Sequence, residues 1–393
     1  MPLSPPPIPA PVVRLARTLE EAGHEAWCVG GALRDHLLGD PQADHDLATS
    51  ATPDEVQRLF RRTVPVGVRF GTVGVLDAEG RLHEVTTFRR DVQTDGRHAV
   101  VEYGASLEDD LARRDFTINA LAFHPLRGEW RDPFGGEADL AARLLRAVGD
   151  PAERFREDFL RILRGLRFAA RFGLRIDEAT WHAMRAEAPG LAGLSAERVR
   201  DEWLKGLRTA RAVTDLVERW HASGAAAVVL PGLHPVGTLP EPPADWPRDA
   251  VLLTSLLVDD APAVLRRLRA SNAEVARAEA LARGPAEPAD ASPSAVRRWM
   301  AGVLDAADDL VAAATLRAGS APAWAAVVAA VRARGEPTRR GDLALRGDDL
   351  RAAGVPPGPA LGRTLDALLA RVLDDPALNT REALLALVQA GVA

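Results

Sequence analysis

The 393-residue sequence has one cysteine and no apolar run of about 18 residues or more. The single cysteine, Cys28, excludes an internal disulfide and suits the reducing cytosol, so we expect a cytoplasmic protein with a buried, inert thiol. The missing apolar run excludes a membrane-spanning helix. The start, MPLSPPPIPAPVV, lacks the basic region and apolar core of a secretion signal. We expect residues 1–11 to form a short, disordered, Pro-rich leader.

An excess of basic charge is also missing, since the formal net charge is −6. This balance argues mildly against a surface coated by nucleic acid, although local charge matters more than net charge. Seven arginines lie between Arg154 and Arg175, against only two acids. Phenylalanines and leucines are interleaved with them, so part of this arginine face must lie near the protein body.

The length predicts two or three domains, and the pattern changes near residue 139. Strand signals and glycine turns occupy the first part, whereas an Ala-, Leu- and Arg-rich helical pattern fills the rest. We therefore expect an α+β chain: an N-terminal head with a small mixed sheet, followed by an all-α neck, body and tail. The expected divisions are a head over 12–138, a helical neck over 139–230, and a helical body and tail over 231–393. The Pro-rich stretch 231–247 is predicted to be a loop or linker.

Within the head, hydrophobic periodicity and capping signals predict a specific order of elements. Thr52-Pro53-Asp54-Glu55 and Ser106 to Asp109 have the spacing of helix capping boxes. Residues 90–105 are rich in turn-forming and charged residues and are predicted to be a mobile loop. The other expected elements are a helix over 12–26, a strand over 26–30, a helix over 31–38, strands over 44–48, 65–76 and 82–89, and a strand-like segment FTINALAF.

A glycine pair, an arginine and alternating carboxylates occur close together in VGGALRDHLLGDPQADHDLAT. Gly30 and Gly31 let backbone N–H groups approach a phosphate without a Cβ in the way. Asp44 and Asp46 point to the same side of an extended segment, where a hard divalent cation such as Mg²⁺ offsets their repulsion. Glu84, inside a neighbouring β-run, is a candidate third carboxylate; a salt bridge at a sheet edge is the alternative. Together these features predict a site for a metal–nucleoside triphosphate.

Two further arginine-rich motifs are candidates for nucleotide binding. Arg113 and Arg114 precede an apolar run and are costly to bury without a triphosphate or an acidic partner. Residues 157–168, EDFLRILRGLRF, are predicted to form one helix, on which Asp158 and Arg161 share a face. An aspartate that accepts beside an arginine that donates matches the base edges of cytosine and adenine but not those of uracil and guanine. An ordinary salt bridge along the helix is the alternative interpretation.

These motifs resemble those of the class II tRNA nucleotidyltransferases, the branch that holds tRNA CCA-adding enzymes and bacterial poly(A) polymerases. EDFLRILRGLRF resembles the E-D-x-x-R helix that selects the nucleotide in that family, and GVRFGTVGV followed by HEVTTFR resembles the CCA-type sequence. Further similarities, in the family's order, lie in RRDFTINAL (113–121), DPFGG (132–136), ERVRDEWLKGL (197–207) and the C-terminal segment 343–385. The resemblance thus runs from Val29 to Leu385.

The resemblance implies an activity and a set of site residues. It implies addition of C and A from CTP and ATP to the tRNA 3′ end, without a nucleic-acid template and with release of pyrophosphate. It also implies Mg²⁺ held by Asp44 and Asp46, with Glu84 as a third catalytic carboxylate. The tRNA acceptor arm is the implied partner, with no DNA and no membrane. The implied nucleotide-binding residues are Gly30, Gly31, Arg34, Arg113, Arg114, Asn119, Asp158, Arg161, Arg164 and Arg167.

The loop after TTFR departs from the family pattern. Gln93 stands where CCA-adding enzymes usually carry tyrosine, Ala99 stands where proline is expected, and the loop is about one residue short. Asp95-Gly96-Arg97 is retained, which favours an enzyme that can add A. Several functions stay open: full CCA addition, CC-only or A-only addition in a divided pathway, poly(A) polymerisation, RNA binding by a catalytically dead head, and nucleotidyl transfer to a small molecule.

Overall fold

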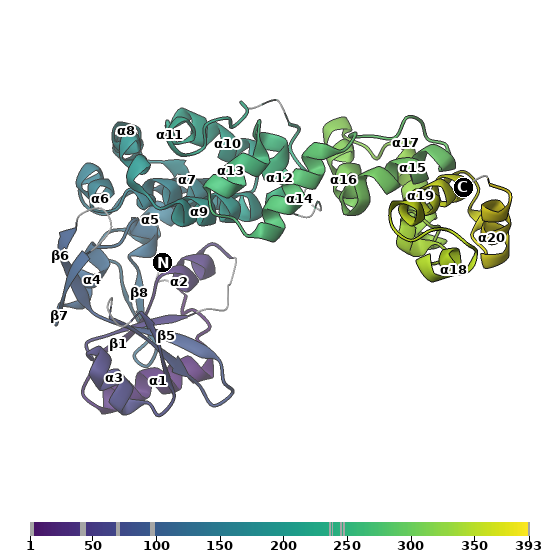
Figure 1. Ribbon diagram of the computed structural model, residues 1–393. Helices are drawn as coiled ribbons and strands as arrows, with labels where there is room; N and C mark the ends of the chain where they lie inside the picture. The colour runs from purple at the N-terminus through teal and green to yellow at the C-terminus, as the bar shows by residue number, and fades with distance from the viewer. Residues whose placement is uncertain are drawn as a thin grey trace. The chain divides into compact units, whose positions relative to one another are not determined.

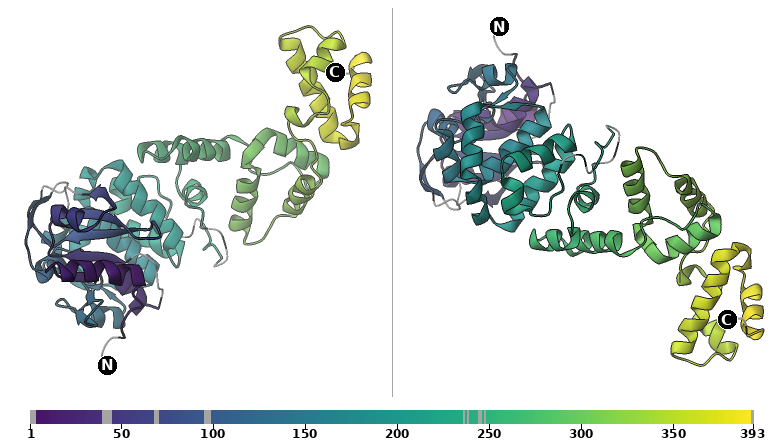
Figure 2. Two further views of the ribbon diagram at one scale, coloured as in Figure 1. Left: turned by 90° about the horizontal axis from the view of Figure 1, so that it is seen from below. Right: turned by 90° about the horizontal axis from the view of Figure 1, so that it is seen from above.

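The computed structural model of the chain describes residues 4–39, 45–67, 71–94, 99–235, 237, 239–243, 246 and 248–391. The chain divides into two compact units, residues 1–231 and 232–393, each with its own packed interior. The first unit holds a β-sheet and a group of helices, and the second is built from helices (Figures 1 and 2). Among the residues that the structure describes, no helix is long and apolar enough to cross a membrane.

A seven-stranded sheet in the order β3-β4-β5-β2-β1-β8-β9 is the centre of the first unit. Neighbouring strands run antiparallel, except that β2 and β5 are parallel, with Leu47 paired to Val85. The sheet is therefore mixed, as the sequence predicts. Its strands are β1 (Ala26–Val29), β2 (Asp46–Thr49), β3 (Thr63–Gly67), β4 (Thr72–Leu76), β5 (Leu82–Thr87), β8 (Ala122–His124) and β9 (Glu129–Arg131).

The two faces of the sheet are covered differently. Helices α1 (Ala10–Glu21) and α3 (Pro53–Leu59) pack on one face, where Leu47 and Val85 are completely buried (Figure 1). On the opposite face, helix α4 (Leu107–Ala112) packs against the β1 and β2 side chains in a second apolar cluster. Because side chains alternate along a strand, this division assigns every sheet residue to one face or the other.

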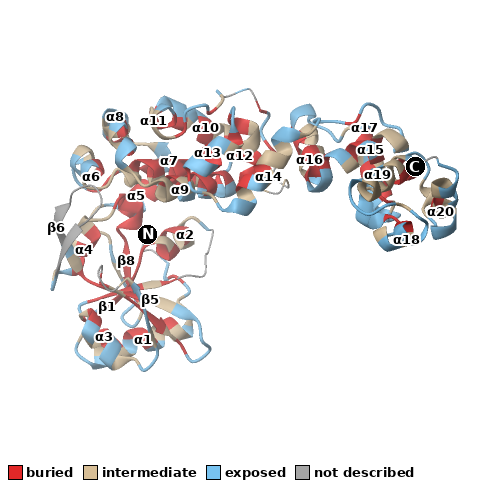
Figure 3. Cartoon of the chain, in the orientation of Figure 1, coloured by how far each residue is buried: buried red, intermediate tan, exposed pale blue. Residues whose placement is uncertain are grey.

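Helices that follow the sheet complete the first unit. Helix α7 (Leu160–Phe172) and helix α9 (Ala196–Thr209) pack against each other, and their inner faces are buried (Figure 3). A two-residue parallel pair, β10 (Leu144–Leu145) with β11 (Arg175–Ile176), is a short exception to the helical pattern. The other elements are α2 (Gly31–Leu37), η2 (Thr117–Asn119), α5 (Gly136–Ala141), α6 (Pro151–Glu157), α8 (Glu178–Glu187), η3 (Ala188–Gly193), α10 (Val213–Ala222) and α11 (Ala225–Val229).

Arginine contacts connect the helices of the second unit, and the side chain of Arg297 is buried. The Arg277 guanidinium binds Asp249 and Asp309, and the Arg297 guanidinium donates to the Leu373 carbonyl and to Glu336. The helices are α12 (Ala250–Leu257), α13 (Ala261–Arg267), α14 (Asn272–Arg283), α15 (Pro293–Val303), α16 (Ala307–Ala318), α17 (Ala323–Ala333), α18 (Gly347–Ala352), α19 (Pro359–Asp374) and α20 (Arg381–Gln389), with short turns η4 (Leu304–Ala306), η5 (Arg340–Asp342) and η6 (Pro376–Leu378).

Several expectations from the sequence are confirmed. Both capping boxes form, at Thr52 with Glu55 and at Ser106 with Asp109. The strand and helix around the glycine pair begin and end within one residue of the predicted bounds. Cys28 is buried, and burial, with a smaller contribution from Asp46, raises the pKa of its thiol to about 12.

Other expectations are wrong. The region 90–105 is not a loop, because β6 (Arg89–Thr94) and β7 (Ala99–Tyr103) pair as an antiparallel hairpin. The segment FTINALAF is only partly a strand, since the 3₁₀ turn η2 precedes β8. Three bounds also move: the first helix spans α1 rather than 12–26, the second strand begins at Asp46, and 65–76 divides into β3 and β4.

Candidate nucleotide site

The candidate site begins where β1 ends. Gly30 adopts φ of +82°, a conformation that favours glycine, and caps helix α2. A Cβ at Gly30 would lie 3.3 Å from Nη1 of Arg114, and a Cβ at Gly31 would lie 3.3 Å from Nη2 of Arg34. Gly30 thus suits the turn, and a side chain at either glycine would crowd the neighbouring guanidinium group.

The candidate carboxylates lie beside this turn, on the next two strands. Asp46 opens β2 and pairs with Val29, the residue before Gly30. Glu84 lies one residue before the Leu47–Val85 pair on β5, as Asp46 does on β2, so the two carboxylates occupy matching positions on parallel neighbouring strands about 5 Å apart. Because β5 lies between β4 and β2, Glu84 is not at a sheet edge, and the alternative of an edge salt bridge is wrong.

The remaining predicted carboxylate, Asp44, lies outside the described residues. Within the described part of the chain, no group of three or more His, Cys, Asp or Glu side chains could hold a metal ion. Of the three carboxylates that the sequence predicts, the structure thus describes Asp46 and Glu84. The segment Asp95-Gly96-Arg97 is likewise outside the described residues.

The Arg113-Arg114 pair has an acidic partner inside the protein. Asp110, which is buried, accepts from Nε and Nη2 of Arg113 and from Nη2 of Arg114. Burial alone would raise the pKa of Asp110, but Arg114 and Arg113 outweigh it and hold that pKa below its usual value. Nε of Arg114 is buried and has no hydrogen-bond partner among the described residues. The Arg114 guanidinium, which points at Gly30, is therefore incompletely satisfied, as a group that awaits an anion would be.

A buried network connects the glycine turn to the helical part of the unit. Nη1 of Arg34 donates to Oδ1 of Asn119, and Nδ2 of Asn119 donates to Asp115 at 2.8 Å. Asp115 also accepts from Nε of Arg164, on α7, at 2.7 Å. Burial would raise the pKa of Asp115, but Arg164 and then Asn119 outweigh it and lower that pKa to about 2. Arg34 itself is only 5% exposed, and its desolvation lowers its pKa.

The helix expected over 157–168 is broken at its second residue. Helix α6 ends at Glu157, Asp158 has an extended backbone, and α7 begins at Leu160. Asp158 accepts from the Leu160 N–H and from Nη2 of Arg198 at 2.6 Å. The prediction of one continuous helix is therefore wrong, and so is the alternative of a salt bridge along it.

Arg161 and Arg167 also bind partners other than those predicted. Arg161 donates to Glu157 and to the main-chain carbonyls of Arg154 and Arg113. Arg167 donates to Glu202 on α9, and both side chains are buried. The guanidinium groups of Arg34, Arg164 and Arg167 lie 4.9, 5.2 and 4.4 Å from the centre of the Phe168 ring. Delocalised cations around an aromatic ring keep α7 close to the glycine turn.

Three models of known protein families match successive parts of the chain. The family model described as "Poly A polymerase head domain" matches residues 26–146. A second model, described as "Probable RNA and SrmB- binding site of polymerase A", matches residues 173–236, and a model of tRNA nucleotidyltransferase domain 2 matches residues 250–388. The CCA-adding enzyme of Limosilactobacillus fermentum is 37% identical over 93% of each chain. That of Geobacillus kaustophilus is 38% identical over 94% of this chain and 93% of its own.

The chain belongs to the family of CCA-adding enzymes. It is therefore a nucleotidyltransferase. Among solved structures, the Bacillus stearothermophilus CCA-adding enzyme in complex with CTP superposes with a TM-score of 0.82 at 31% identity, covering 99% of this chain and 98% of that one. The Thermotoga maritima CCA-adding enzyme complexed with tRNA shares the fold, with a TM-score of 0.66 at 19% identity over 97% of this chain and 95% of its own.

Sequence reasoning in this nucleotidyltransferase allowed for an acidic partner of Arg113 and Arg114 without identifying Asp110, and it missed the partners of Arg167 and Asp158. Asp110 precedes Arg113 and Arg114 by three and four residues in α4, a spacing that predicts contact on a helix. That signal was available in the sequence. Glu202 and Arg198 lie on α9, far along the chain from their partners on or before α7, and no local pattern indicates those pairs.

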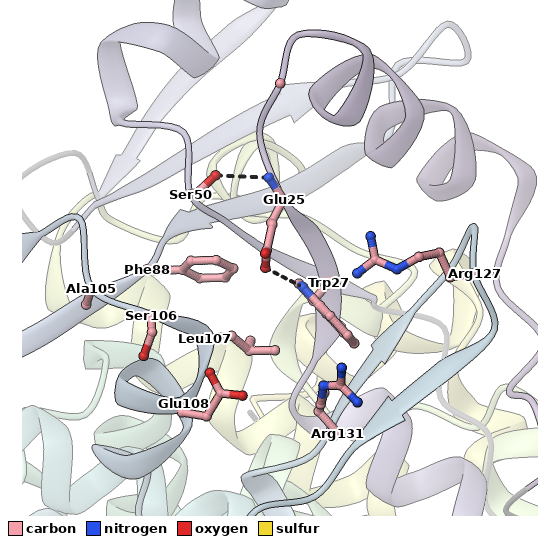
Figure 4. A pocket seen from close by; sticks show the side chains of 11 residues that line it. Glu25, Trp27, Ser50, Phe88, Ala105, Ser106, Leu107, Glu108, Arg127 and Arg131 are labelled. Carbon is pink, nitrogen blue, oxygen red and sulfur yellow. Dashed lines mark hydrogen bonds between the residues drawn. The ribbon is translucent and has the colours of Figure 1, made fainter.

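A cavity of about 380 Å³ lies at the other end of β1, away from the glycine turn (Figure 4). Glu25 accepts from the indole N–H of Trp27, and Arg127 and Arg131 lie over the Trp27 ring. Several polar groups that line it therefore have partners within the protein, and the cavity contains none of the predicted nucleotide-binding residues.

The Asp115 network yields a prediction about acid stability. The pKa of Asp115 is lowered from 3.8 to about 2, so its ionised form stabilises the native state at neutral pH. Asp115→Asn should cost about 2 kcal/mol of unfolding free energy at pH 7. This stabilisation is present above pH 3.8 and is lost as the pH falls toward 2, so wild type and variant should converge there. Urea unfolding of wild type and variant across this pH range measures the difference in unfolding free energy. Asp201→Asn, which removes an aspartate from an exposed ion pair, is the control. Equal stability at pH 7 would contradict it.

Proposed function

We propose that this chain transfers C and A from CTP and ATP to the 3′ end of tRNA, without a nucleic-acid template and with release of pyrophosphate. The observation that carries the proposal is the adjacency of three features: the Gly30-Gly31 turn, the Arg114 guanidinium above it, and the carboxylates of Asp46 and Glu84 beside it. The proposal gains support from the two relatives named CCA-adding enzyme that match over more than nine-tenths of both chains.

In this proposal the triphosphate lies against the glycine turn. Backbone N–H groups there can approach phosphate oxygens because no Cβ intervenes. Arg114, whose Nε has no hydrogen-bond partner among the described residues, would bind the triphosphate. Asp110 would hold the guanidinium groups of Arg113 and Arg114 in place. Arg34 is buried beneath the turn, so it would act by supporting Gly31, with Asn119 fixing its guanidinium.

Asp44, Asp46 and Glu84 would hold divalent metal, and we propose Mg²⁺. Carboxylate oxygens alone form the donor set, which fits a hard cation shared with substrate phosphates. These residues would hold the ion where, when bound, it could lower the pKa of the attacking hydroxyl and stabilise the charge that develops on the phosphate. The residues then orient the reactants for in-line displacement at the α-phosphate.

Nucleotide choice is assigned to Asp158 and Arg161, at the start of α7. Asp158 accepts and Arg161 donates, which matches the amine and ring nitrogen of cytosine and adenine. Arg164 and Arg167 would hold α7 in place through Asp115 and Glu202. We further propose a head over 12–138, a neck over 139–230 and a tRNA-binding body and tail over 231–393, acting on the acceptor arm by shape and phosphate contacts in the cytoplasm.

Substitution of the carboxylates should stop catalysis without unfolding the protein. Asp44→Ala, Asp46→Asn and Glu84→Gln each remove a metal ligand, and we expect single-turnover incorporation to fall by about a thousandfold or more. Glu79→Gln removes a charge from an exposed turn of the same unit and is the matched control. Retained activity in the Asp44 and Asp46 variants, with native circular dichroism, would remove the metal assignment.

Substitution at the start of α7 should change selectivity more than rate. In Asp158→Ala the acceptor for the exocyclic amine is lost, so discrimination of CTP and ATP against UTP and GTP should fall by about tenfold or more. Arg198→Ala is the control, because it removes the arginine that binds Asp158 and leaves the Asp158 carboxylate in place. Competition between labelled nucleotides measures the effect, and unchanged selectivity in Asp158→Ala would reject the base-reading role.

Three tRNA substrates separate the remaining activities. We expect addition of CCA to a tRNA that ends at the discriminator base, of CA to one that ends in C, and of A to one that ends in CC. Addition of A alone, or a stop at CC, would assign the chain to a divided pathway and implicate Gln93 and Ala99. Repeated A addition to an RNA other than tRNA would instead identify a poly(A) polymerase.

A further inference from the structure

Three large apolar side chains are exposed together on one side of the sheet. Val64, Val66 and Leu82 are 38%, 46% and 47% exposed, and we call them the apolar strip. They surround Gly74: a Cβ there would lie 2.7 Å from both Leu82 Cδ1 and Val66 Cγ2, and Val64 is its cross-strand partner. Grouped apolar exposure of this kind marks a surface that contacts something else.

The apolar strip shares a sheet face with the catalytic carboxylates. Gly74 pairs directly with Glu84, and residues paired across strands point to the same side. The sheet order then gives one continuous row at this end of the sheet: the glycine turn after β1, Asp46 on β2, Glu84 on β5, Gly74 on β4 and Val64 on β3. The carboxylates separate the glycine turn from the apolar strip.

This order has a mechanistic consequence, which rests on the proposed function. In an in-line displacement the attacking hydroxyl and the leaving pyrophosphate lie on opposite sides of the α-phosphate. The triphosphate is assigned to the glycine turn, so the RNA must reach the carboxylates from the side of β5, β4 and β3. We propose that the apolar strip is the platform on which the 3′-terminal base of the tRNA rests while its hydroxyl attacks.

The chemistry of the apolar strip suits this occupant. During CCA addition the terminal base is first the discriminator base, then C, then C again. A surface that read base edges by hydrogen bonds would reject some of these ends, because an unmatched polar group is costly to desolvate. Valine and leucine side chains offer neither donor nor acceptor, and contact with the face of a base tolerates all four bases. The apolar strip would thus accept whichever base ends the tRNA at each step, while Asp158 and Arg161 would select the incoming nucleotide.

The test replaces apolar side chains of the strip by threonine, which carries a hydroxyl group. In the double variant Val66→Thr/Leu82→Thr, we expect the apparent KM for addition of C to a tRNA ending in C to rise about tenfold, with CTP affinity unchanged. Threonine is β-branched and favours strands, so the strands should persist. Leu126→Thr, at a leucine 37% exposed beyond β8, is the matched control and should leave KM unchanged.

A second substrate identifies the contact itself. On a tRNA whose 3′-terminal residue lacks its base, wild type and the double variant should have the same KM, because the contact is already absent. An equal loss on both tRNAs, or weaker CTP binding by the variant, would overturn the assignment of the apolar strip to the terminal base. Wild-type kinetics on both substrates would overturn it as well. If the unsubstituted protein adds no nucleotide to any tRNA, the proposed function itself fails, a result that the variants cannot produce.

Discussion

The buried carboxylate of Asp115 fixes the geometry on which the rest of the site depends. It accepts from the Phe116 N–H, from Asn119 and from Arg164, so one side chain connects the strand region to α7. Through Asn119 the connection continues to Arg34 and to the glycine turn. A buried charge is costly unless it is fully paired, so each member of this network constrains the position of the others. The residues assigned to the triphosphate and to the base therefore lie in one connected, compact unit.

The sheet contributes a second constraint, because the order of its strands determines which side chains are neighbours. The parallel pairing of β2 with β5 brings Asp46 and Glu84 to matching positions, although 38 residues separate them along the chain. Helices α1 and α3 cover the opposite face, which leaves the carboxylate face available beyond β2. A change of one residue in register would move Glu84 to the helix-covered face, where a charged group would be buried.

Local sequence signals predicted what local physics determines. The capping boxes at Thr52 and Ser106, the strand before Gly30 and the helix after it depend on neighbours in the chain, and they were found. The break at Asp158 was not predicted, because EDFLRILRGLRF has helical spacing throughout and contains no proline. Long-range bonds accompany the break: Arg198 binds Asp158, and the Arg113 carbonyl accepts from Arg161. The hairpin over β6 and β7 was hidden by a polar, turn-rich composition.

The break before α7 changes how the proposed base reading works. On a continuous helix, Asp158 and Arg161 could satisfy each other, and a nucleotide would have to separate them. Here Asp158 binds Arg198 and Arg161 binds Glu157. A nucleotide can therefore form hydrogen bonds with Asp158 and Arg161 without first breaking a salt bridge between them. A carboxylate offers about four lone-pair sites, so Asp158 can keep Arg198 and Leu160 and still accept an amine. In the proposed function, Arg198 and Glu157 would therefore preorganise Asp158 and Arg161 for selection without a nucleic-acid template.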